Sequence, residues 1–384
     1  MTFNDLELSP GLLQAVADLG LSEPFSIQTQ AIPLILAGRD LCARAKTGSG
    51  KTLAYALPIL EKLGGSDSRR GSSISALVLV PTRELADQVG KVFVDLVRGM
   101  RHPCVVRVAH GGTSINTQML GLRGGADVLV ATPGRLIDLA SKNAARLGAL
   151  RFLVLDEADK MLDLGFSEEL SSVLALLPER RQSLLFSATM SGKIEEVEAA
   201  CLHDPARIEV DGIGGESASA SGEKAPDLGL VELVYTVEPE SKGPLLRRII
   251  TDGGYERVLV FASSTRRADN VSRKLNNNGI VALPFHGDLS QGARTTALAD
   301  FRSGALRVLV ASDLASRGLD IEGLPCVVNY ELPRSPLDYI HRVGRTGRAG
   351  ERGLAVTLVS PDEEAMLHLI EKKIGRKLPR APAE

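Results

Sequence analysis

The sequence contains no tryptophan, and only 4% of its 384 residues are aromatic. Proteins that hold nucleic acids through stacked bases need exposed aromatic side chains as platforms, so stacking cannot be the main means of binding here. An excess of charge is also missing, because 45 Lys and Arg stand against 47 Asp and Glu, for a net charge of −2. This balance argues against a basic coat over the whole protein, but it leaves room for a local basic groove.

Cysteines and long apolar runs are scarce as well. Cys42, Cys104, Cys201 and Cys326 are widely scattered and show no metal-ligand spacing, so we expect small buried residues in a reducing compartment. No stretch approaches the roughly 20 apolar residues of a membrane span. The N-terminus also lacks the basic segment and apolar core of a secretion signal. We therefore expect a cytoplasmic protein that does not contact a membrane.

Short apolar runs, separated by helix-length segments, recur along the whole chain. They lie at 76–80, 127–131, 152–155 and 183–186, and again at 258–261, 282–285, 308–311 and 327–330. Such runs are typical of buried strands in parallel sheets. The Gly- and Ser-rich segment 211–227 has no apolar periodicity, which indicates a flexible linker. The sequence thus predicts an α/β fold with two similar parallel-sheet domains joined by a flexible linker.

Residues 45–52 match a phosphate-binding loop, except that Ala45 stands where the strict pattern has Gly. Gly48 and Gly50 would let backbone N–H groups curl around a phosphate. Lys51 would reach the β- and γ-phosphates, and the hydroxyl of Thr52 would ligate Mg²⁺. An apolar, helical run follows at 53–60, so a helix N-terminus would point at the anion. The alternative is a glycine-rich turn, which Lys-Thr at this spacing argues against.

Two carboxylates, Asp156 and Glu157, come directly after the apolar run 152–155. Ligands of open α/β sheets bind beyond the carboxyl ends of the strands. There one carboxylate would hold Mg²⁺ and the other would activate a water molecule. The alternative is that Asp156 caps the next helix and Glu157 complements its dipole. The pair alone leaves both interpretations open, and the phosphate loop favours catalysis.

Hydroxyl and Arg residues follow three other apolar runs of the first half. They are Thr82 and Arg83, Thr132 and Arg135, and Ser187 and Thr189. For any single strand, ordinary helix capping is the simpler interpretation. Three strand ends of this kind in one half of the chain favour another interpretation, in which hydrogen-bond donors line one rim of one sheet. Such a row of donors could bind the phosphate backbone of a nucleic acid.

The second half has no phosphate loop but carries a cluster of arginines. Arg342, Arg345 and Arg348 are three residues apart, and this spacing predicts that they lie along one face of a helix. A solvated basic helix end is one interpretation. The glycines between the arginines, and the phosphate loop in the first half, favour an arginine-finger role.

With these residues in place, the chain resembles the DEAD-box ATP-dependent RNA helicases over about residues 3 to 360. Asp156-Glu157-Ala158-Asp159 is the family's name motif, and Ala45 is the family's own variant of the phosphate loop. The complete set of matching segments is Phe3 with Gln28, 45–52, 81–85, 111–112, 132–135, 156–159, 187–189, 291–294, 317–320 and 341–348. One departure is Leu21, where the family usually has an aromatic residue that stacks on adenine.

The resemblance implies two RecA-like domains with ATP and RNA between them. The implied limits are an N-terminal Q-motif segment at 1–31, an ATP-binding domain at 32–210, the linker at 211–227, a C-terminal helicase domain at 228–375 and a short basic tail at 376–384. It implies ATP-dependent, local separation of short RNA duplexes or remodelling of RNA–protein complexes, with Mg²⁺ as cofactor and RNA held mainly by its backbone. The alternative output is an ATP-gated RNA clamp without productive unwinding. We expect a monomer.

The resemblance also assigns roles to individual residues. Gln28 would select adenine, Glu157 would activate water, and Asp320 would touch the ribose. The implied nucleotide contacts are Gln28, Ala45, Lys46, Thr47, Gly48, Ser49, Gly50, Lys51, Thr52 and Asp320, and the implied metal ligands are Thr52 and Asp156. The implied catalytic residues are Lys51, Glu157, Arg345 and Arg348. The implied RNA contacts are Thr82, Arg83, Gly112, Thr132, Arg135, Gln291, Arg294 and Ser312. Ser187, Thr189 and His341 would couple hydrolysis to strand separation.

Overall fold

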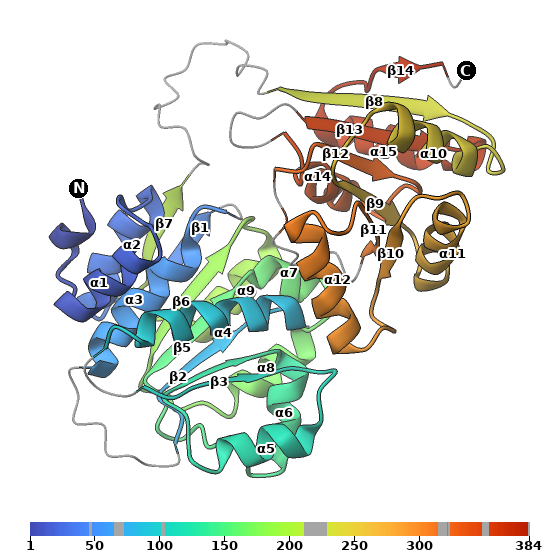
Figure 1. Ribbon diagram of the computed structural model, residues 1–384. Coiled ribbons are helices and arrows are strands. Elements are labelled where there is room, and N and C mark those ends of the chain that lie inside the picture. Colours follow the sequence, from blue (N-terminus) through green and yellow to red (C-terminus); the bar gives the residue numbers. More distant parts are fainter. Residues whose placement is uncertain are drawn as a thin grey trace, which may run out of the picture. The chain divides into compact units, whose positions relative to one another are not determined.

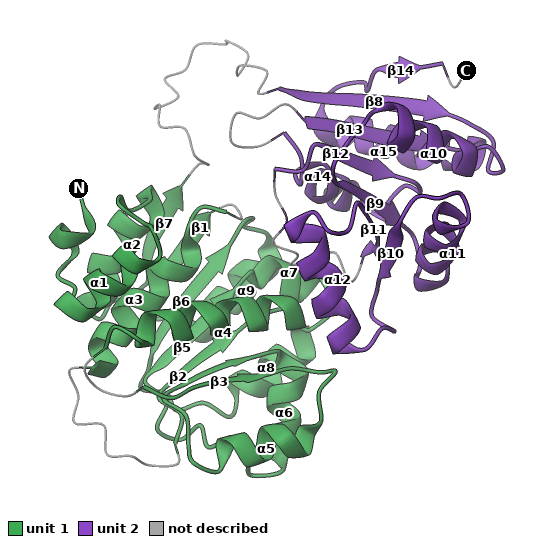
Figure 2. Ribbon diagram, viewed as in Figure 1, with its two compact units in different colours: residues 1–218 green, residues 219–384 purple. Residues whose placement is uncertain are grey.

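The chain forms two units, residues 1–218 and 219–384, and each is built on its own seven-stranded sheet (Figure 2). The computed structural model describes residues 1–45, 48–64, 73–100, 104–210, 229–313, 321, 323–347 and 353–382. The predicted linker at 211–227 lies outside these residues. All described neighbouring strands run parallel, so the predicted α/β class with two parallel sheets is confirmed.

The sheet of unit 1 has the strand order β3-β4-β2-β5-β6-β1-β7 (Figure 1). Its strands are β1 (Leu41–Ala45), β2 (Ala76–Leu79), β3 (Val106–Ala109), β4 (Val128–Ala131), β5 (Phe152–Asp156), β6 (Gln182–Ser187) and β7 (Ala206–Val210). Its helices are η1 (Phe3–Leu6), α1 (Pro10–Asp18), α2 (Ser26–Leu36), α3 (Lys51–Gly64), α4 (Arg83–Val97), α5 (Ile115–Leu122), α6 (Pro133–Ser141), α7 (Ala158–Asp163), α8 (Ser167–Leu174) and α9 (Gly192–Cys201).

Successive residues of each central strand point into two different apolar cores. In β5, Phe152 and Val154 belong to the core that α1, α2, α3 and α4 cover, whereas Leu153 and Leu155 belong to the core under α6, α7, α8 and α9. Figure 1 shows α4 in front of this sheet and α9 behind it. A strand that is buried on both faces must be apolar throughout, which explains why these runs are detectable in the sequence.

The sheet of unit 2 has the order β10-β11-β9-β12-β13-β8-β14. Its strands are β8 (Leu230–Thr236), β9 (Val258–Ala262), β10 (Ala282–Phe285), β11 (Val308–Ser312), β12 (Cys326–Asn329), β13 (Gly353–Val359) and β14 (Arg380–Ala381). Its described helices are α10 (Lys242–Asp252), α11 (Thr265–Asn276), α12 (Gln291–Ser303), α14 (Pro336–Val343), η2 (Pro361–Glu363) and α15 (Glu364–Ile374). The eight predicted strands are observed as β2, β4, β5, β6, β9, β10, β11 and β12, within one residue at either end.

Candidate active site

The phosphate loop, Asp156 and Ser187 lie at one edge of the sheet of unit 1. The loop follows β1, Asp156 ends β5 and Ser187 ends β6, and these three strands are neighbours in the order β5-β6-β1. Parallel strands end at the same edge, so the fold brings these parts of the predicted site together. Lys46 and Thr47, which were predicted to contact nucleotide, lie outside the described residues.

The backbone of the phosphate loop requires glycine. Gly48 and Gly50 have φ values of 81° and 86°, in the left-handed region that residues with a Cβ rarely adopt. A Cβ at Gly50 would also lie 2.5 Å from Nε2 of Gln28 and 2.6 Å from Cδ2 of Phe25. Lys51 opens α3 with its side chain buried, and its Nζ donates to the carbonyl oxygen of Ala45 at 3.1 Å. The backbone thus turns sharply at Gly48 and Gly50, and the Lys51 ammonium group is held against the end of β1.

Gln28 ties the N-terminal segment to this loop. Its side chain is fully buried, Nε2 donates to the carbonyl oxygen of Gly50 at 3.0 Å, and Oε1 accepts from the backbone N–H of Phe25 at 2.9 Å. Leu21 is half-buried and packs against the apolar core of unit 1. The structure therefore shows Gln28 as a link to the phosphate loop, while adenine selection stays a prediction.

The two carboxylate oxygens of Asp156 lie in different surroundings. Its Oδ2 accepts from the hydroxyl of Tyr55 at 2.8 Å, whereas its buried Oδ1 has no hydrogen-bond partner in the described part of the chain. Burial raises the pKa of Asp156 above its usual value; the Lys51 ammonium group opposes this shift, and the Glu157 carboxylate adds to it. A desolvated oxygen of this kind fits a cation, because a buried charge needs a counter-charge. Tyr55 lies four residues after Lys51 on α3, and this helical spacing was the available sign that it faces the site.

Glu157 lies in a strained backbone conformation between β5 and α7. Its φ is 54°, which is rare for a residue other than glycine and is often found at functional sites. Its Oε1 accepts from Nζ of Lys160 at 2.7 Å, and both side chains are buried. Asp156 does not cap the next helix, because it is the last residue of β5; Glu157 takes the N-cap position of α7, and its side chain forms no cap bond there. Lys160 was not predicted from the sequence, although it follows Glu157 by one helical turn.

The fourth residue of the same motif, Asp159, binds the end of β6. Its Oδ2 accepts from the backbone N–H groups of Ala188 and Thr189 at 3.1 and 3.0 Å, and from the hydroxyl of Thr189 at 3.1 Å. The hydroxyl of Ser187 in turn donates to the carbonyl oxygen of Thr189 at 2.6 Å. One buried carboxylate therefore fixes residues 187–189 beside Glu157.

The first-half residues predicted to touch RNA lie along the same edge of the sheet, after β2, β3 and β4. Thr82 does cap a helix, because its hydroxyl accepts from the backbone N–H of Leu85, whereas the side chain of Thr132 makes no cap bond. Arg83 lies against Gly112, where φ is 87° and a Cβ would come within 2.5 Å of Nη1 of the arginine. Arg135 donates to the carbonyl oxygen of Thr113 and to the side chain of Gln118 at 3.1 and 2.9 Å.

In unit 2, Gln291 and Arg294 occupy the first turn of α12, and Ser312 ends β11. Arg294 is buried, and its guanidinium group lies 5.0 Å from the ring centroid of Phe285. These residues follow β10 and β11, which are neighbours in the sheet. Asp320 lies outside the described residues.

The prediction that the arginines line one helix face is wrong. Helix α14 ends at Val343, so His341 and Arg342 are helical, but Arg345 lies beyond the helix, and Arg348 is outside the described residues. Gly344 is the C-cap and ends the helix before Arg345. Arg342 instead anchors the interior of unit 2. It donates to Oδ1 of Asp313 at 2.7 Å, to Oδ1 of Asn329 at 3.0 Å and to the carbonyl oxygen of Glu331 at 2.7 Å.

Among the described residues, no three His, Cys, Asp or Glu side chains gather into a metal site. None of the described helices has both the length and the apolar character needed to cross a membrane.

Comparison with known proteins places the chain. A family model described as DEAD/DEAH box helicase matches residues 25–197, and one described as helicase conserved C-terminal domain matches residues 241–350. The DEAD-box ATP-dependent RNA helicase CshA of Bacillus licheniformis is 38% identical over 386 residues, which cover 100% of this chain and 75% of the relative. The CshA protein of Geobacillus kaustophilus is 39% identical over 381 residues, which cover 99% of this chain and 78% of the relative.

Solved structures agree with this placement. Saccharomyces cerevisiae Dbp5 bound to RNA and ADP BeF3 matches with a TM-score of 0.84 and 28% identity, over 100% of this chain and 96% of that one. A DEAD box protein from Methanococcus jannaschii matches with a TM-score of 0.52 and 32% identity, over 99% of both chains. The fold is therefore that of a protein with two RecA-like domains. The chain belongs to the family of DEAD-box ATP-dependent RNA helicases, and it is an enzyme that uses ATP.

Proposed function

We propose that the protein hydrolyses ATP in response to RNA and uses this reaction to separate short RNA duplexes locally or to remodel RNA–protein complexes, without processive movement. The observation that carries the proposal is the buried Oδ1 of Asp156, which has no hydrogen-bond partner among the described residues. It lies one residue from the strained Glu157, at the sheet edge where the phosphate loop follows β1. A cation site, a base and a phosphate-binding loop at one edge are the parts that phosphoryl transfer to water requires.

Each residue has a definite task in this proposal. The backbone of 45–50 and the ammonium group of Lys51 bind the phosphates, and the hydroxyl of Thr52 with the carboxylate of Asp156 would hold Mg²⁺. When bound, this ion neutralises charge that develops on the phosphate oxygens. Glu157 accepts a proton from the attacking water, and Lys160 keeps its carboxylate oriented. Arg345 and Arg348 of unit 2 supply positive charge to the transferred phosphoryl group. Gln28 selects the adenine, and Asp320 binds the ribose.

RNA recognition is assigned to both units, through Thr82, Arg83, Gly112, Thr132 and Arg135 of unit 1 and Gln291, Arg294 and Ser312 of unit 2. These groups suit phosphates and ribose hydroxyls rather than base edges, so the protein would distinguish RNA from DNA by the 2′-hydroxyl. Ser187, Thr189 and His341 couple hydrolysis to strand separation. We also propose the domain limits 32–210 and 228–375 and a monomeric state. All four cysteines are free thiols, which fits a reducing compartment such as the cytoplasm.

The test compares Lys51→Ala with Lys62→Ala, a lysine in the last turn of the same helix. RNA-stimulated ATP turnover should fall by about 10²–10³-fold in the first variant, as when one preorganised donor is removed from a charged transition state, and should stay near the original rate in the second. Both variants should keep the thermal midpoint of the unaltered protein. Substantial turnover in a folded Lys51→Ala variant would refute the assignment.

Two further measurements distinguish this function from two alternatives, a DNA translocase and an ATP-gated RNA clamp. ATP turnover should rise with single-stranded RNA and not with single-stranded DNA, and equal stimulation by DNA would indicate a DNA translocase. Short RNA duplexes should separate when ATP is added. Long residence on RNA without duplex separation would instead indicate an ATP-gated clamp.

A further inference from the structure

The hydroxyl of Tyr55 on α3 donates to Oδ2 of Asp156 at the end of β5, at 2.8 Å, and both side chains are buried. The direction of this bond follows from the chemistry of the two groups. A tyrosine hydroxyl keeps its proton at neutral pH, because its pKa is ordinarily about 10, and an ionised carboxylate can only accept. The proposed function gives Tyr55 no task, although its hydrogen-bond partner is one of the two proposed metal ligands.

The ring of Tyr55 is held by the core around it. It is fully buried, and its centroid lies 6.2 Å from that of Phe93 on α4 and 5.3 Å from that of Phe186 on β6. Both pairs are tilted, and aromatic rings attract each other in such arrangements. Protein cores are close-packed, so the ring cannot be displaced without moving these neighbours. The hydroxyl is therefore kept in one position, where it holds Oδ2 of Asp156.

The bond to Oδ2 determines how the other oxygen of Asp156 is presented. While Oδ2 is engaged, the buried Oδ1 has no hydrogen-bond partner among the described residues. Thr52, the second proposed metal ligand, precedes Tyr55 by three residues on α3, and this spacing puts the two side chains on the same face of the helix. One helix thus carries both a proposed ligand and the group that orients the other ligand.

We propose that Tyr55 is a positioning residue for the metal site, and that its hydroxyl holds the Asp156 carboxylate so that Oδ1 is the oxygen offered to Mg²⁺. The inference rests on the proposed function, in which Thr52 and Asp156 hold this ion. Carboxylates that bind metal ions are in turn hydrogen-bonded by outer partners, which orient them and tune their affinity. Tyr55 is such a partner.

The same hydrogen bond makes the site favour Mg²⁺ over Ca²⁺. Mg²⁺ demands a near-ideal octahedron, whereas Ca²⁺ accepts a flexible geometry and takes carboxylates through one or both oxygens. A carboxylate with one oxygen engaged and the other held in place suits the stricter ion. Without the hydroxyl of Tyr55, the carboxylate of Asp156 would be free to turn and to offer both oxygens, which suits Ca²⁺ better than Mg²⁺.

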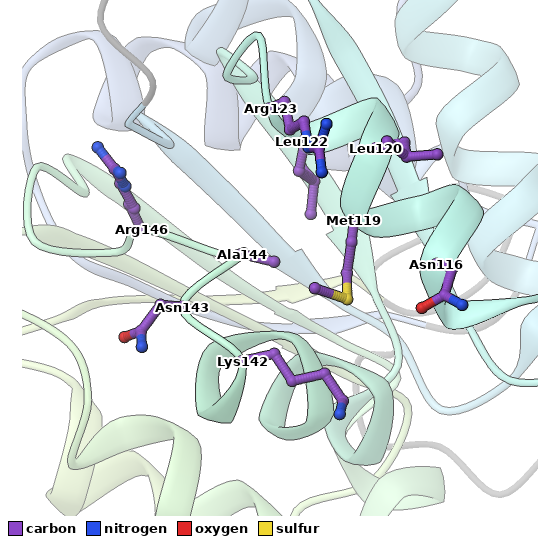
Figure 3. Close-up of a pocket in the computed structure, with 9 residues that line it drawn as sticks. All are labelled: Asn116, Met119, Leu120, Leu122, Arg123, Lys142, Asn143, Ala144 and Arg146. Carbon is purple, nitrogen blue, oxygen red and sulfur yellow. The ribbon is translucent and has the colours of Figure 1, made fainter.

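A cavity elsewhere in unit 1 offers no second place for this ion. It has a volume of about 430 Å³ and lies between α5 and the segment that follows α6 (Figure 3). Among the described residues, its lining contains Arg123, Lys142 and Arg146 but no Asp or Glu, so a cation would meet positive charge and no carboxylate. Figure 3 shows these three side chains pointing in different directions. Metal binding measured for the chain therefore does not reflect this cavity.

The experiment compares the full chain with Tyr55→Phe and Tyr339→Phe. Tyr55→Phe removes the hydroxyl but keeps the ring. Tyr339→Phe is the matched control, because the hydroxyl of the buried Tyr339 on α14 donates to Oε1 of Glu232 on β8 at 3.0 Å, so each variant loses one buried tyrosine–carboxylate bond. Binding of Mn²⁺ together with ADP is followed by electron paramagnetic resonance, and competition with Mg²⁺ or Ca²⁺ gives the affinity for each ion.

Tyr55→Phe should bind Mg²⁺ about 10–100-fold more weakly, which is the usual cost of removing the hydrogen-bond partner of a metal ligand. Its affinity for Ca²⁺ should fall by less, so that the preference for Mg²⁺ shrinks. The Mg²⁺ concentration that half-saturates RNA-stimulated ATP turnover should rise, while the rate at saturating Mg²⁺ should stay near the original, because Lys51 and Glu157 are unaltered. Tyr339→Phe should match the unaltered chain in each of these measurements, and thermal unfolding should show that both variants are folded.

Three outcomes would overturn the inference: an unchanged Mg²⁺ affinity in Tyr55→Phe, an equal loss of Mg²⁺ affinity in Tyr339→Phe, or an equal fall in the affinities of Tyr55→Phe for Mg²⁺ and Ca²⁺. A different result would contradict the proposed function instead. If Asp156→Asn bound Mn²⁺ with ADP as tightly as the unaltered chain does, Asp156 would not be a metal ligand. The two failures are therefore distinguishable.

Discussion

The buried imidazole of His110 is bonded to the carboxylate of Asp87, with 2.9 Å between Nε2 and Oδ1. Its other ring nitrogen, Nδ1, lies 2.8 Å from the carbonyl oxygen of Gly111. Both partners are acceptors, so both ring nitrogens must donate, and only the imidazolium form has two N–H groups. A charged His110 therefore fixes Gly111 at the start of the glycine loop that contacts Arg83.

Unit 2 contains a similar histidine–aspartate pair, but only one of its ring nitrogens is hydrogen-bonded among the described residues. His286 follows β10, the edge strand that corresponds to β3, and its Nε2 lies 3.0 Å from Oδ1 of Asp269 on α11. Its Nδ1 is buried without a hydrogen-bond partner in the described residues. One N–H group therefore completes the hydrogen bond of His286, whereas His110 has an acceptor at both ring nitrogens.

RNA affinity should therefore fall as the pH rises through the pKa of His110. Burial lowers this pKa, but the Asp87 carboxylate, the Gly111 carbonyl and Glu84 outweigh the effect of burial and hold the pKa above 6.5. Arg83 is the cation that faces the same loop. Because the folded-state pKa is raised, the bond to Gly111 is intact below about pH 6.5 and is lost as the pH rises through the higher, folded value.

Dissociation constants for RNA measured between about pH 6 and pH 9 check this, because imidazole titrations fall in that range. His110→Gln should weaken binding at low pH and flatten the profile, whereas the matched variant His286→Gln should keep the pH step. A step that survived in His110→Gln would show that another group titrates.

Strands and motifs that are marked by consecutive residues could be predicted from the sequence, whereas contacts between distant residues could not. Strands such as β5, buried on both faces, are apolar throughout and were predicted, but β3 and β7 have half-exposed, alternating side chains and were not. Contiguous motifs such as 156–159 were recognised together with their chemistry. Tyr55 was missed because its bond to Asp156 joins residues 101 positions apart, and only the folded sheet brings them together.

The prediction for Arg345 failed for the opposite reason, because the spacing of nearby arginines was taken as evidence of a single helix face. Its spacing from Arg342 fits a helix face, but spacing does not reveal where a helix ends. Gly344 forms the C-cap at that point, so one arginine became an interior anchor while the other was left beyond the helix.

Glu157→Gln should bind ATP and RNA but hydrolyse ATP at least about 10²-fold more slowly, because an amide preserves shape and is a poor base. The variant also replaces the charged partner of the Lys160 ammonium group, 2.7 Å away, with a neutral amide. Lys160→Met is therefore the control: it removes the ion pair but keeps the base, and it should slow turnover far less. Single-turnover hydrolysis and the residence time on RNA with ATP measure both effects. Turnover at the original rate in Glu157→Gln would exclude it as the base.

Asp159→Asn should separate ATP hydrolysis from RNA unwinding. The carboxylate accepts three hydrogen bonds from Ala188 and Thr189, and hydrogen bonds to a charged group contribute about 1.5–3 kcal/mol each. A neutral amide weakens them and loosens residues 187–189 without touching the phosphate loop. Unwound duplex per ATP consumed should fall, and Thr189→Val should give the same change. A variant that lost ATP turnover and unwinding in equal proportion would contradict this coupling role.

The last prediction contrasts Arg345 with Arg342. The backbone of Arg345 is held outside α14, since its carbonyl oxygen accepts from the backbone N–H of Leu324 at 3.1 Å, and the hydroxyl of Thr346 donates to the carbonyl of the same leucine. Arg345 therefore lies in the loop that follows α14, with its side chain buried, whereas Arg342 lies within the helix. The phosphate loop and Glu157 belong to unit 1, so neither unit alone contains every residue assigned to catalysis.

Arg345→Ala should lower RNA-stimulated turnover by about 10³–10⁵-fold, the usual cost of losing an arginine finger, with ATP affinity and the thermal midpoint little changed. Arg345→Lys should restore only part of the rate, because an ammonium group keeps the charge but not the two-pronged geometry. Arg342→Ala should behave oppositely. It leaves the Asp313 carboxylate without its buried partner, which costs about 3–5 kcal/mol of stability.

Steady-state kinetics with saturating RNA and thermal unfolding of the three variants decide between the two roles. If Arg345→Ala unfolded as readily as Arg342→Ala, its slow turnover would reflect lost structure and not a lost catalytic charge. If it turned over ATP at the original rate, hydrolysis would depend on unit 1 alone, and the shared assignment of catalysis to both units would be wrong.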